Sequence, residues 1–190
     1  MKTKLRIVLH KINYGIILAS LYLLLNSCVN EPDFNKIPFI SFNSISQKFL
    51  PNESADSIRV VLNFTDGNGD LGLNVTENDP PYNEINPDGQ FNKYFNNYFI
   101  EVKKKVNGKF EKVVFPENAN FNGRYPRLNT SDVERSLEGE LAYTFRMYLN
   151  VGGAPISTND TLIFEIQIAD RSLNLSNTIS TTEIIAGSVK

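Results

Sequence analysis

The sequence predicts an all-β protein that folds as an antiparallel sandwich of two sheets with about seven strands. Three observations lead to this expectation. Several segments alternate apolar and polar residues with a period of two, which is the pattern of a half-buried strand. The dipeptide Asn107-Gly108 separates two such segments, and Asn-Gly is typical of a two-residue hairpin turn. After the first 27 residues, no stretch repeats its apolar residues with a long helical period.

Three of the expected strands show the alternation clearly. In 57–65 every even-numbered residue from 58 to 64 is apolar, and in 161–169 the same holds from 162 to 168. In 137–149 the odd-numbered residues from 141 onward are apolar instead. Because side chains alternate across a strand, each of these segments has one face suited to a core.

The remaining strands are placed by composition and by turns. The first is a short apolar run at 37–42, and the pair 98–106 and 109–115 flanks the Asn-Gly turn. A turn at 170–174 leads into the last expected strand, 175–184. Short strands joined by turn-rich segments favour a two-sheet antiparallel sandwich.

The N-terminal 27 residues have the layout of a bacterial signal peptide. Residues 1–11 are basic, and 12–25 are almost wholly apolar but too short to cross a bilayer as a helix. The segment Leu25-Asn26-Ser27-Cys28 resembles a lipobox, in which the cysteine is acylated and becomes the new N-terminus. We therefore expect a signal peptide at 1–27, lipidation at Cys28, a polar tether at 28–36 and a β-sandwich domain at 37–190. The alternative is an uncleaved anchor helix with an incidental cysteine.

The charge and the rare residue types exclude several classes of function. Of the 19 basic and 21 acidic residues, four basic and no acidic ones lie in 1–27, so residues 28–190 hold 15 and 21, a net charge of −6. This balance argues against a nucleic-acid partner, which usually requires a basic face. The only histidine, His10, and the only cysteine, Cys28, belong to the leader and its cleavage site. The domain then lacks histidine-based triads, cysteine nucleophiles and His/Cys zinc ligands, so we do not expect an enzyme.

A long acidic, glycine-rich loop, 66–92, follows the early strand at 57–65. Loops of this length are uncommon in compact domains and often carry function. The loop opens with Asp66-Gly67-Asn68-Gly69-Asp70, which places side-chain oxygens at alternate positions. Glu77 falls at position 12 of the same frame, counted from Asp66. Several oxygen ligands on a flexible backbone are what Ca²⁺ prefers.

Two interpretations of this loop stay open. The first is a calcium loop on a β-scaffold, to which Asp79 and Asp170 add ligands if the fold brings them close. It is not an EF-hand, because Leu71 stands where that loop needs glycine and no helices flank it. The second is a turn with solvated carboxylates and no metal. A nucleotide site at 67–72 is excluded, since no helix follows to hold a pyrophosphate. The candidate calcium ligands are Asp66, Asn68, Asp70 and Glu77.

Aromatic residues and arginines offer a second candidate site. The aromatic residues between 91 and 99 provide rings on which sugars could stack, or they pack in the core and as cross-strand pairs. Arg124 and Arg127 either meet an acidic ligand or pair with Glu134 and Glu138. Glu138 and Glu140 lie roughly 7 Å apart on one strand face, as catalytic carboxylates or as solvated edge residues. The candidate ligand-binding residues are Tyr82, Tyr94, Tyr125 and Arg124.

Two sets of residues carry a resemblance to known families. The stretch from Asn159-Asp160-Thr161-Leu162 to Asp170-Arg171-Ser172-Leu173-Asn174 resembles the last hairpin of immunoglobulin-like and fibronectin-type-III-like bacterial modules. Together with FTDGNGDLGL, Asp79-Pro80-Pro81-Tyr82 and Asn122-Gly123-Arg124-Tyr125-Pro126, it resembles lipoproteins of Bacteroidota. The resemblance implies an immunoglobulin-like sandwich on an outer-membrane lipoprotein, periplasmic or surface-exposed, and no particular activity.

Three functions are compatible with these observations. We favour a lipid-anchored binding or structural module of the cell envelope, with or without stabilising calcium, whose partner is a protein or a glycan. An alternative is a carboxylate- or metal-dependent glycan hydrolase, which needs two acids that face each other across a cleft. The third is an accessory subunit of an outer-membrane complex.

Overall fold

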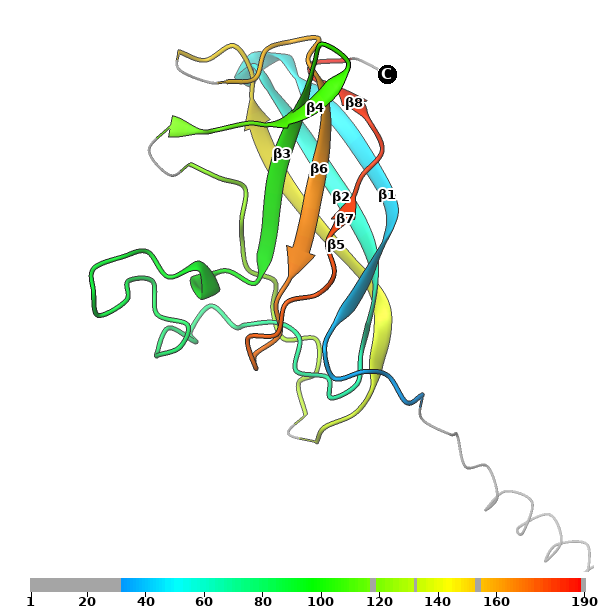
Figure 1. The fold of residues 1–190 in the computed structure, drawn as a ribbon, viewed down its shortest axis with the longest axis vertical. Coiled ribbons are helices and arrows are strands. Elements are labelled where there is room, and N and C mark those ends of the chain that lie inside the picture. Colours follow the sequence, from blue (N-terminus) through cyan, green and yellow to red (C-terminus); the bar gives the residue numbers. More distant parts are fainter. Residues whose placement is uncertain (1–31, 117–118, 132, 153–154, 189–190) are drawn as a thin grey trace, which may run out of the picture. The chain divides into compact units, whose positions relative to one another are not determined.

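The computed structural model describes residues 32–188 with the exception of 117–118, 132 and 153–154. The expected signal peptide and Cys28 lie outside the described residues. Within them the protein is all-β, with two antiparallel sheets and no α-helix (Figure 1), as the sequence predicts. Residues 33–190 belong to one compact unit, and the description below concerns that unit alone.

The first sheet has three strands in the order β1-β2-β5, which are β1 (Phe39–Leu50), β2 (Ala55–Asp66) and β5 (Leu137–Tyr148). A single 3-10 turn, η1 (Pro51–Glu53), closes the β1–β2 hairpin. The first strand was expected at 37–42. It is longer because its pairing with β2 continues past a register shift between Phe42 and Ser44 as far as Leu50.

The second sheet has five strands, ordered β4-β3-β6-β7, with β8 also paired to β6. The Asn-Gly hairpin between β3 and β4 is confirmed, with φ of 51° at Asn107 and 81° at Gly108. The strands are β3 (Tyr98–Val106), β4 (Lys109–Lys112), β6 (Thr161–Ile168), β7 (Ile179–Ser180) and β8 (Ile184–Ile185).

The last expected strand, 175–184, is wrong as a continuous element. Side-chain hydroxyls take the place of backbone acceptors along β6, since Ile168 N donates to Ser176 Oγ at 3.0 Å and Phe164 N donates to Thr181 Oγ1 at 3.1 Å. The ladder is therefore interrupted, and only the short strands β7 and β8 remain. The described residues thus form eight strands rather than about seven.

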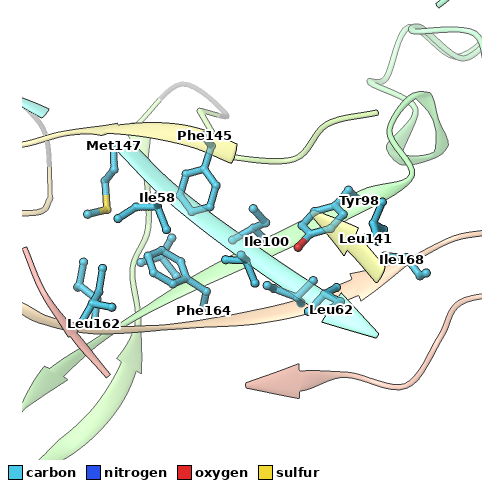
Figure 2. Packing of buried hydrophobic residues seen from close by; sticks show 14 of the residues in the cluster. Ile58, Leu62, Tyr98, Ile100, Leu141, Phe145, Met147, Leu162, Phe164 and Ile168 are labelled. Atoms are coloured by element: carbon cyan, nitrogen blue, oxygen red, sulfur yellow. The ribbon is translucent and has the colours of Figure 1, made fainter. Parts of the chain in front are cut away.

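The core lies between the two sheets and follows the predicted alternation. The even-numbered residues of β2 from Ile58 to Phe64 and those of β6 from Leu162 to Ile168 are buried. Figure 2 shows the facing side chains of the two sheets. The Phe145 and Phe164 rings meet edge to face with centroids 5.3 Å apart. This contact links β5 of the first sheet to β6 of the second.

The chain enters the sandwich at the end that carries the long loop. Gly67 N donates to Asn35 O at 2.8 Å, and a Cβ at Gly67 would lie 2.1 Å from Phe34 O. Glycine is therefore required there for close backbone approach. The hairpin turns at 51–53 and 107–108 lie at the opposite end (Figure 1).

Candidate functional site

The long loop is confirmed by the structure. β2 ends at Asp66, and the residues up to Asn92 form only isolated bridges, Leu71 with Asp170 and Ile85 with Phe91. A 3-10 turn, η2 (Lys93–Phe95), then leads to β3. Backbone hydrogen bonds attach the start of the loop to two distant segments, at 125–128 and at 171. The loop is thus ordered by residues that lie 50 to 100 positions away in the sequence.

The side chains of Asp66, Asn68 and Asp70 lie close together in the first turn of the loop. One end of the Asn68 amide lies 3.1 Å from both Asp66 Oδ1 and Asp70 Oδ1. Gly69 has a φ of 67°, which glycine adopts without steric cost. Asp66 is fully buried, whereas Asn68 and Asp70 are partly exposed. The three side chains form an oxygen-rich group that is open to solvent on one side.

A third carboxylate, Asp170, lies next to this group. It is 2% exposed and pairs through its backbone with Leu71. Asn174 donates to both of its oxygens, from N to Oδ1 at 2.7 Å and from Nδ2 to Oδ2 at 2.8 Å. Ser172 donates to Asp70 Oδ2 in a similar way, from Oγ at 2.7 Å.

The carboxyl group of Asp66 is incompletely hydrogen-bonded. Its Oδ2 atom is buried and has no hydrogen-bond partner among the described residues. Burial, followed by the charges of Asp70 and Asp170, raises the pKa of Asp66 to about 6. Burial also raises the pKa of Asp170, although the bonds from Asn174 oppose it. A buried acid whose pKa is raised by burial and by neighbouring charges is one mark of functional sites.

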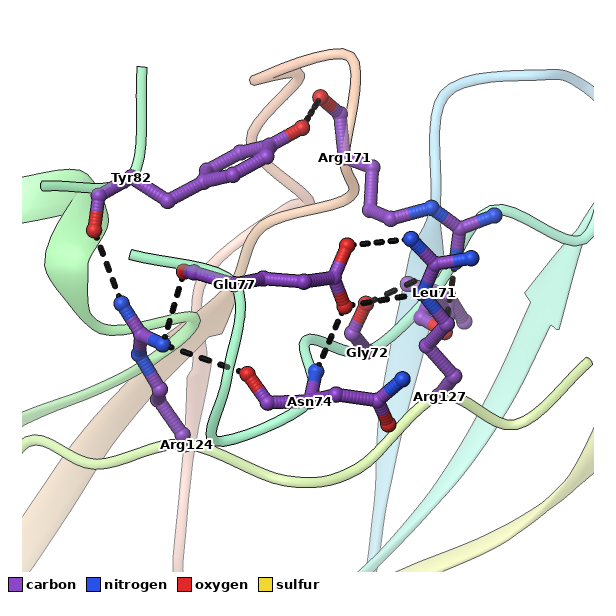
Figure 3. Close-up of polar contacts among 8 residues, drawn as sticks. All are labelled: Leu71, Gly72, Asn74, Glu77, Tyr82, Arg124, Arg127 and Arg171. Atoms are coloured by element: carbon purple, nitrogen blue, oxygen red, sulfur yellow. Dashed lines mark hydrogen bonds and ion pairs between the residues drawn. The ribbon is translucent and has the colours of Figure 1, made fainter. Parts of the chain in front are cut away.

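Glu77, the fourth candidate calcium ligand, has other partners. Arg127 donates to it with two nitrogens, Nε to Oε2 at 2.8 Å and Nη2 to Oε1, and Asn74 N donates to Oε2 at 2.7 Å (Figure 3). The hydrogen bond from Arg127 is the main reason why the pKa of Glu77 falls to about 2. Both carboxylate oxygens are therefore bonded within the protein.

Arg124 is hydrogen-bonded to the middle of the loop. Its guanidinium donates to Tyr82 O at 2.8 Å and to Glu77 O at 3.1 Å (Figure 3). A further acceptor is Asn78 Oδ1, at 3.1 Å. It also donates to Phe95 O and lies over the Phe95 ring at 4.2 Å. Most of the donors of this candidate ligand-binding residue are thus used inside the protein.

The three candidate tyrosines lie in different surroundings. The Tyr82 hydroxyl donates to Arg171 O, which fastens the loop to the turn after β6. Tyr94 lies on η2, partly exposed, with Lys93 Nζ 4.5 Å from its ring centroid. Tyr125 is 4% exposed and donates to Ala169 O at 3.4 Å, so it offers no ring face to a ligand. Of the four candidate ligand-binding residues, Tyr82 and Arg124 are joined by a hydrogen bond.

Some of the other aromatic and charged candidates are buried in the core and others are exposed. Tyr98 belongs to the core and stacks on Tyr143 with centroids 4.4 Å apart, whereas Phe91 is 48% exposed. Glu138 and Glu140 are exposed on β5, and Glu140 accepts a hydrogen bond from Asn43 Nδ2 at 3.0 Å.

The loop exposes large apolar side chains that sequence reasoning did not single out. Val75 is 83% exposed and Ile85 is 53% exposed. Val75 also lines a pocket of about 440 Å³. The signal available in the sequence was the presence of aliphatic residues in an otherwise polar loop. The other residues that line this pocket are Asn78, Glu84, Phe95 and Arg124.

A second pocket of about 450 Å³ lies along β3, next to the segment that leaves β4. Phe99, Phe115 and Gln167 are among the residues that line it. Its two acids are engaged in ion pairs, Glu165 with Lys103 and Glu101 with Lys112. None of the candidate ligand-binding or calcium-binding residues lines it.

Comparison of the sequence with protein-family models, and of the sequence and structure with curated proteins and solved structures, finds no match. Among the described residues, no three His, Cys, Asp or Glu side chains are grouped closely enough to hold a metal ion by themselves. The same part of the chain contains no helix with the length and apolar character needed to span a membrane.

Proposed function

We propose that this protein is a lipid-anchored module of the cell envelope that binds a partner through its 67–92 loop and does not act as an enzyme. The observation that carries the proposal is an ordered loop that exposes Val75, Ile85 and Phe91. Ile85 pairs with Phe91, the Phe91 ring meets Phe95, and Phe95 lines one pocket with Val75. Exposed apolar side chains that lie near one another are typical of interaction sites.

The order within the loop supports a binding role. Arg124 and Arg127 attach its middle part, and Tyr82 attaches it to the turn after β6. A surface fixed in this way loses little conformational entropy when a partner docks. The bonds that hold the loop thereby favour recognition of a defined shape.

The chemistry of the exposed side chains favours a protein partner over a glycan. Val75 and Ile85 are aliphatic, and the chain has no tryptophan, the largest aromatic side chain available for stacking. A partner that is itself an outer-membrane protein corresponds to the role of an accessory subunit.

We also propose that the sandwich is immunoglobulin-like. In that architecture strands A, B and E share one sheet and strands C, F and G the other. Numbering the strands β1 to β7 in chain order as A, B, C, C′, E, F and G gives sheets ordered A-B-E and C′-C-F-G. This order supports the resemblance carried by the closing segment 159–177.

The proposed anchor is the acylated Cys28, in the outer membrane and facing the periplasm or the cell surface. Asn35, the first residue hydrogen-bonded to the loop, lies only seven residues after Cys28. Seven extended residues reach at most about 25 Å. The domain is therefore expected to stay close to the lipid surface.

The binding proposal is tested by cross-linking the native protein in intact cells and recovering its partners. The double variant Val75→Ser, Ile85→Ser is expected to lose the partners that the wild type recovers. Val114→Ser is the matched control, because Val114 is 78% exposed but lies outside the loop. Equal recovery by all three proteins would reject the loop as the binding surface.

Mass spectrometry of protein extracted from membranes tests the anchor. The expected species begins at Cys28 and carries acyl chains, and Cys28→Ala is expected to leave the leader uncleaved. An unmodified, full-length wild-type chain would contradict the proposal.

A further inference from the structure

The strongest unexplained feature of the structure is the buried Asp66 carboxylate at the end of β2. It is 0% exposed, and its Oδ2 atom has no hydrogen-bond partner in the described part of the chain. The backbone amides of Gly69 and Asp70 donate to this carboxylate, so Oδ2 is the atom whose lost hydration is not replaced. A buried carboxylate with incomplete hydrogen bonding is costly unless a proton or a positive ion neutralises it.

The neighbours of Asp66 add negative charge. Its Oδ1 atom faces the Asn68 amide, which also touches Asp70 Oδ1, each at 3.1 Å. The charges of Asp70 and Asp170 both act on Asp66, and none of the ion pairs in the described ranges involves any of these three acids. The nearby Arg171 directs its Nη1 to the carbonyls of Leu71 and Gly72, at 3.4 and 3.5 Å.

The Asn68 amide is compatible with two states of this group. With its nitrogen turned inward, it donates to both carboxylates. With its oxygen turned inward, this oxygen lies near Asp66 Oδ1 and Asp70 Oδ1. Side-chain oxygens from alternate residues also surround the ion in a calcium loop. A half-turn of one side chain converts a hydrogen-bonded state into a set of ligands.

We propose that Asp66, Asn68 and Asp70 bind a Ca²⁺ ion, with Asp170 supplying further negative charge and Glu77 taking no part. No three acids of the described residues are grouped so as to hold a metal ion by themselves, so other oxygens must complete this site. Ca²⁺ accepts about six to eight oxygens, including amide oxygens, backbone carbonyls and water. Because Asn68 and Asp70 are partly exposed, water can complete the shell.

Ser172 and Asn174 act as positioning residues in this site. Ser172 holds Asp70 Oδ2 by two hydrogen bonds, and this leaves Asp70 Oδ1 directed at Asn68. Asn174 holds Asp170. The site depends neither on the partner surface around Val75 nor on the lipid, so it can be tested separately from them.

The test uses the full chain, purified in detergent and freed of metal with EDTA. Addition of Ca²⁺ is expected to raise the melting temperature, because the ion binds only the folded form. Tb³⁺ is expected to luminesce on tyrosine excitation, since the phenol of Tyr125 lies where the charges of Asp66 and Asp70 reach it. Excess Ca²⁺ should remove that luminescence.

Two variants make the test specific. Asp70→Asn, at a partly exposed position, is expected to fold and to weaken Ca²⁺ binding about tenfold or more. Glu77→Gln is the matched control. It removes an acid of the same loop and should lower the melting temperature in EDTA, yet keep the wild-type Ca²⁺ affinity.

Four results would overturn the proposal. They are a wild type that responds to neither ion, an Asp70→Asn variant with unchanged affinity, a Glu77→Gln variant that no longer binds, and an equal response to Mg²⁺. Cross-linking to the partner, repeated in EDTA, reports on the binding function independently of these results.

Discussion

At the scale of single residues, buried polar atoms affect the free energy of unfolding according to whether they have hydrogen-bond partners. Tyr98 is an example in the core. Its ring is fully buried and stacks on Tyr143, but its hydroxyl has no hydrogen-bond partner among the described residues. A buried hydroxyl without a partner carries the cost of its lost hydration.

Removal of this hydroxyl is expected to stabilise the protein. Tyr98→Phe keeps the ring and should raise the free energy of unfolding by about 1 kcal/mol. Tyr82→Phe is the control, because the Tyr82 hydroxyl donates to Arg171 O, and it should lower the free energy by about 1 kcal/mol. Urea unfolding measures both changes, and a loss of stability in Tyr98→Phe would contradict the expectation.

Asp66 predicts a pH dependence in metal-free protein. Its pKa rises from 3.8 to about 6 on folding, so the folded form favours the protonated acid. Protonated Asp66 therefore stabilises the folded form relative to ionised Asp66. This stabilisation is fully present below pH 3.8 and is lost as the pH rises through about 6. The free energy of unfolding falls by about 3 kcal/mol over that range.

Asp66→Asn should abolish the fall in the free energy of unfolding that accompanies ionisation of Asp66. In EDTA, its free energy of unfolding is expected to exceed that of the wild type at pH 8 by up to about 3 kcal/mol and to match it near pH 4. Urea unfolding at several pH values measures the difference. A constant difference across the range would show that Asp66 does not titrate as described.

The sequence predicted part of the acidic site at this scale. Spacing alone indicated that Asp66, Asn68 and Asp70 share one side of the turn. Spacing also suggested Glu77, which instead pairs with Arg127, 50 residues further along the chain. Such a pairing depends on how the folded chain brings two loops together, and the local pattern of either loop contains no sign of it.

At the scale of elements, the long loop depends on one guanidinium. Arg124 bonds to carbonyls at both ends of 74–82 and stacks on Phe95. A lysine carries the same charge but lacks the planar set of donors. The loop is thus expected to be sensitive to a substitution that preserves charge.

Arg124→Lys should increase hydrogen exchange in 74–82 by about tenfold, while β2 and β6 keep their protection. Arg146→Lys is the control, since Arg146 forms an exposed ion pair with Glu53 and should have no effect. Hydrogen exchange read by mass spectrometry compares the three proteins. Unchanged exchange in 74–82 would show that other bonds suffice to hold the loop.

The strands show which elements a local pattern can predict. β2, β5 and β6 alternate apolar and polar residues, and both their existence and their buried faces were predicted. The full length of β1 was missed because residues 43–50 are mostly polar and are paired only through β2. The split between β7 and β8 was missed because Ser176 and Thr181 accept bonds with their side chains.

At the scale of the whole molecule, stability depends on contact between the two sheets. Phe164 is fully buried and meets Phe145 across the core (Figure 2). Phe164→Ala leaves a cavity in a layer that both sheets share, and it should lower the free energy of unfolding by about 3–5 kcal/mol.

The exposed Phe39, at the start of β1, provides the matched control. Phe39→Ala should cost less than about 1 kcal/mol, because little area returns to water. Chemical unfolding followed by circular dichroism measures both. A similar loss for the two variants would mean that the sheets are not coupled through Phe164.

The hydrogen bond from Gly67 to Asn35 has a consequence for how the protein presents itself to other molecules. If Cys28 carries lipid, the base of the loop lies at most about 25 Å from the acylated residue. The hairpin turns at 51–53 and 107–108 lie at the opposite end of the domain (Figure 1). Under that condition, proteins of the same membrane are the first candidates to test as partners of the loop.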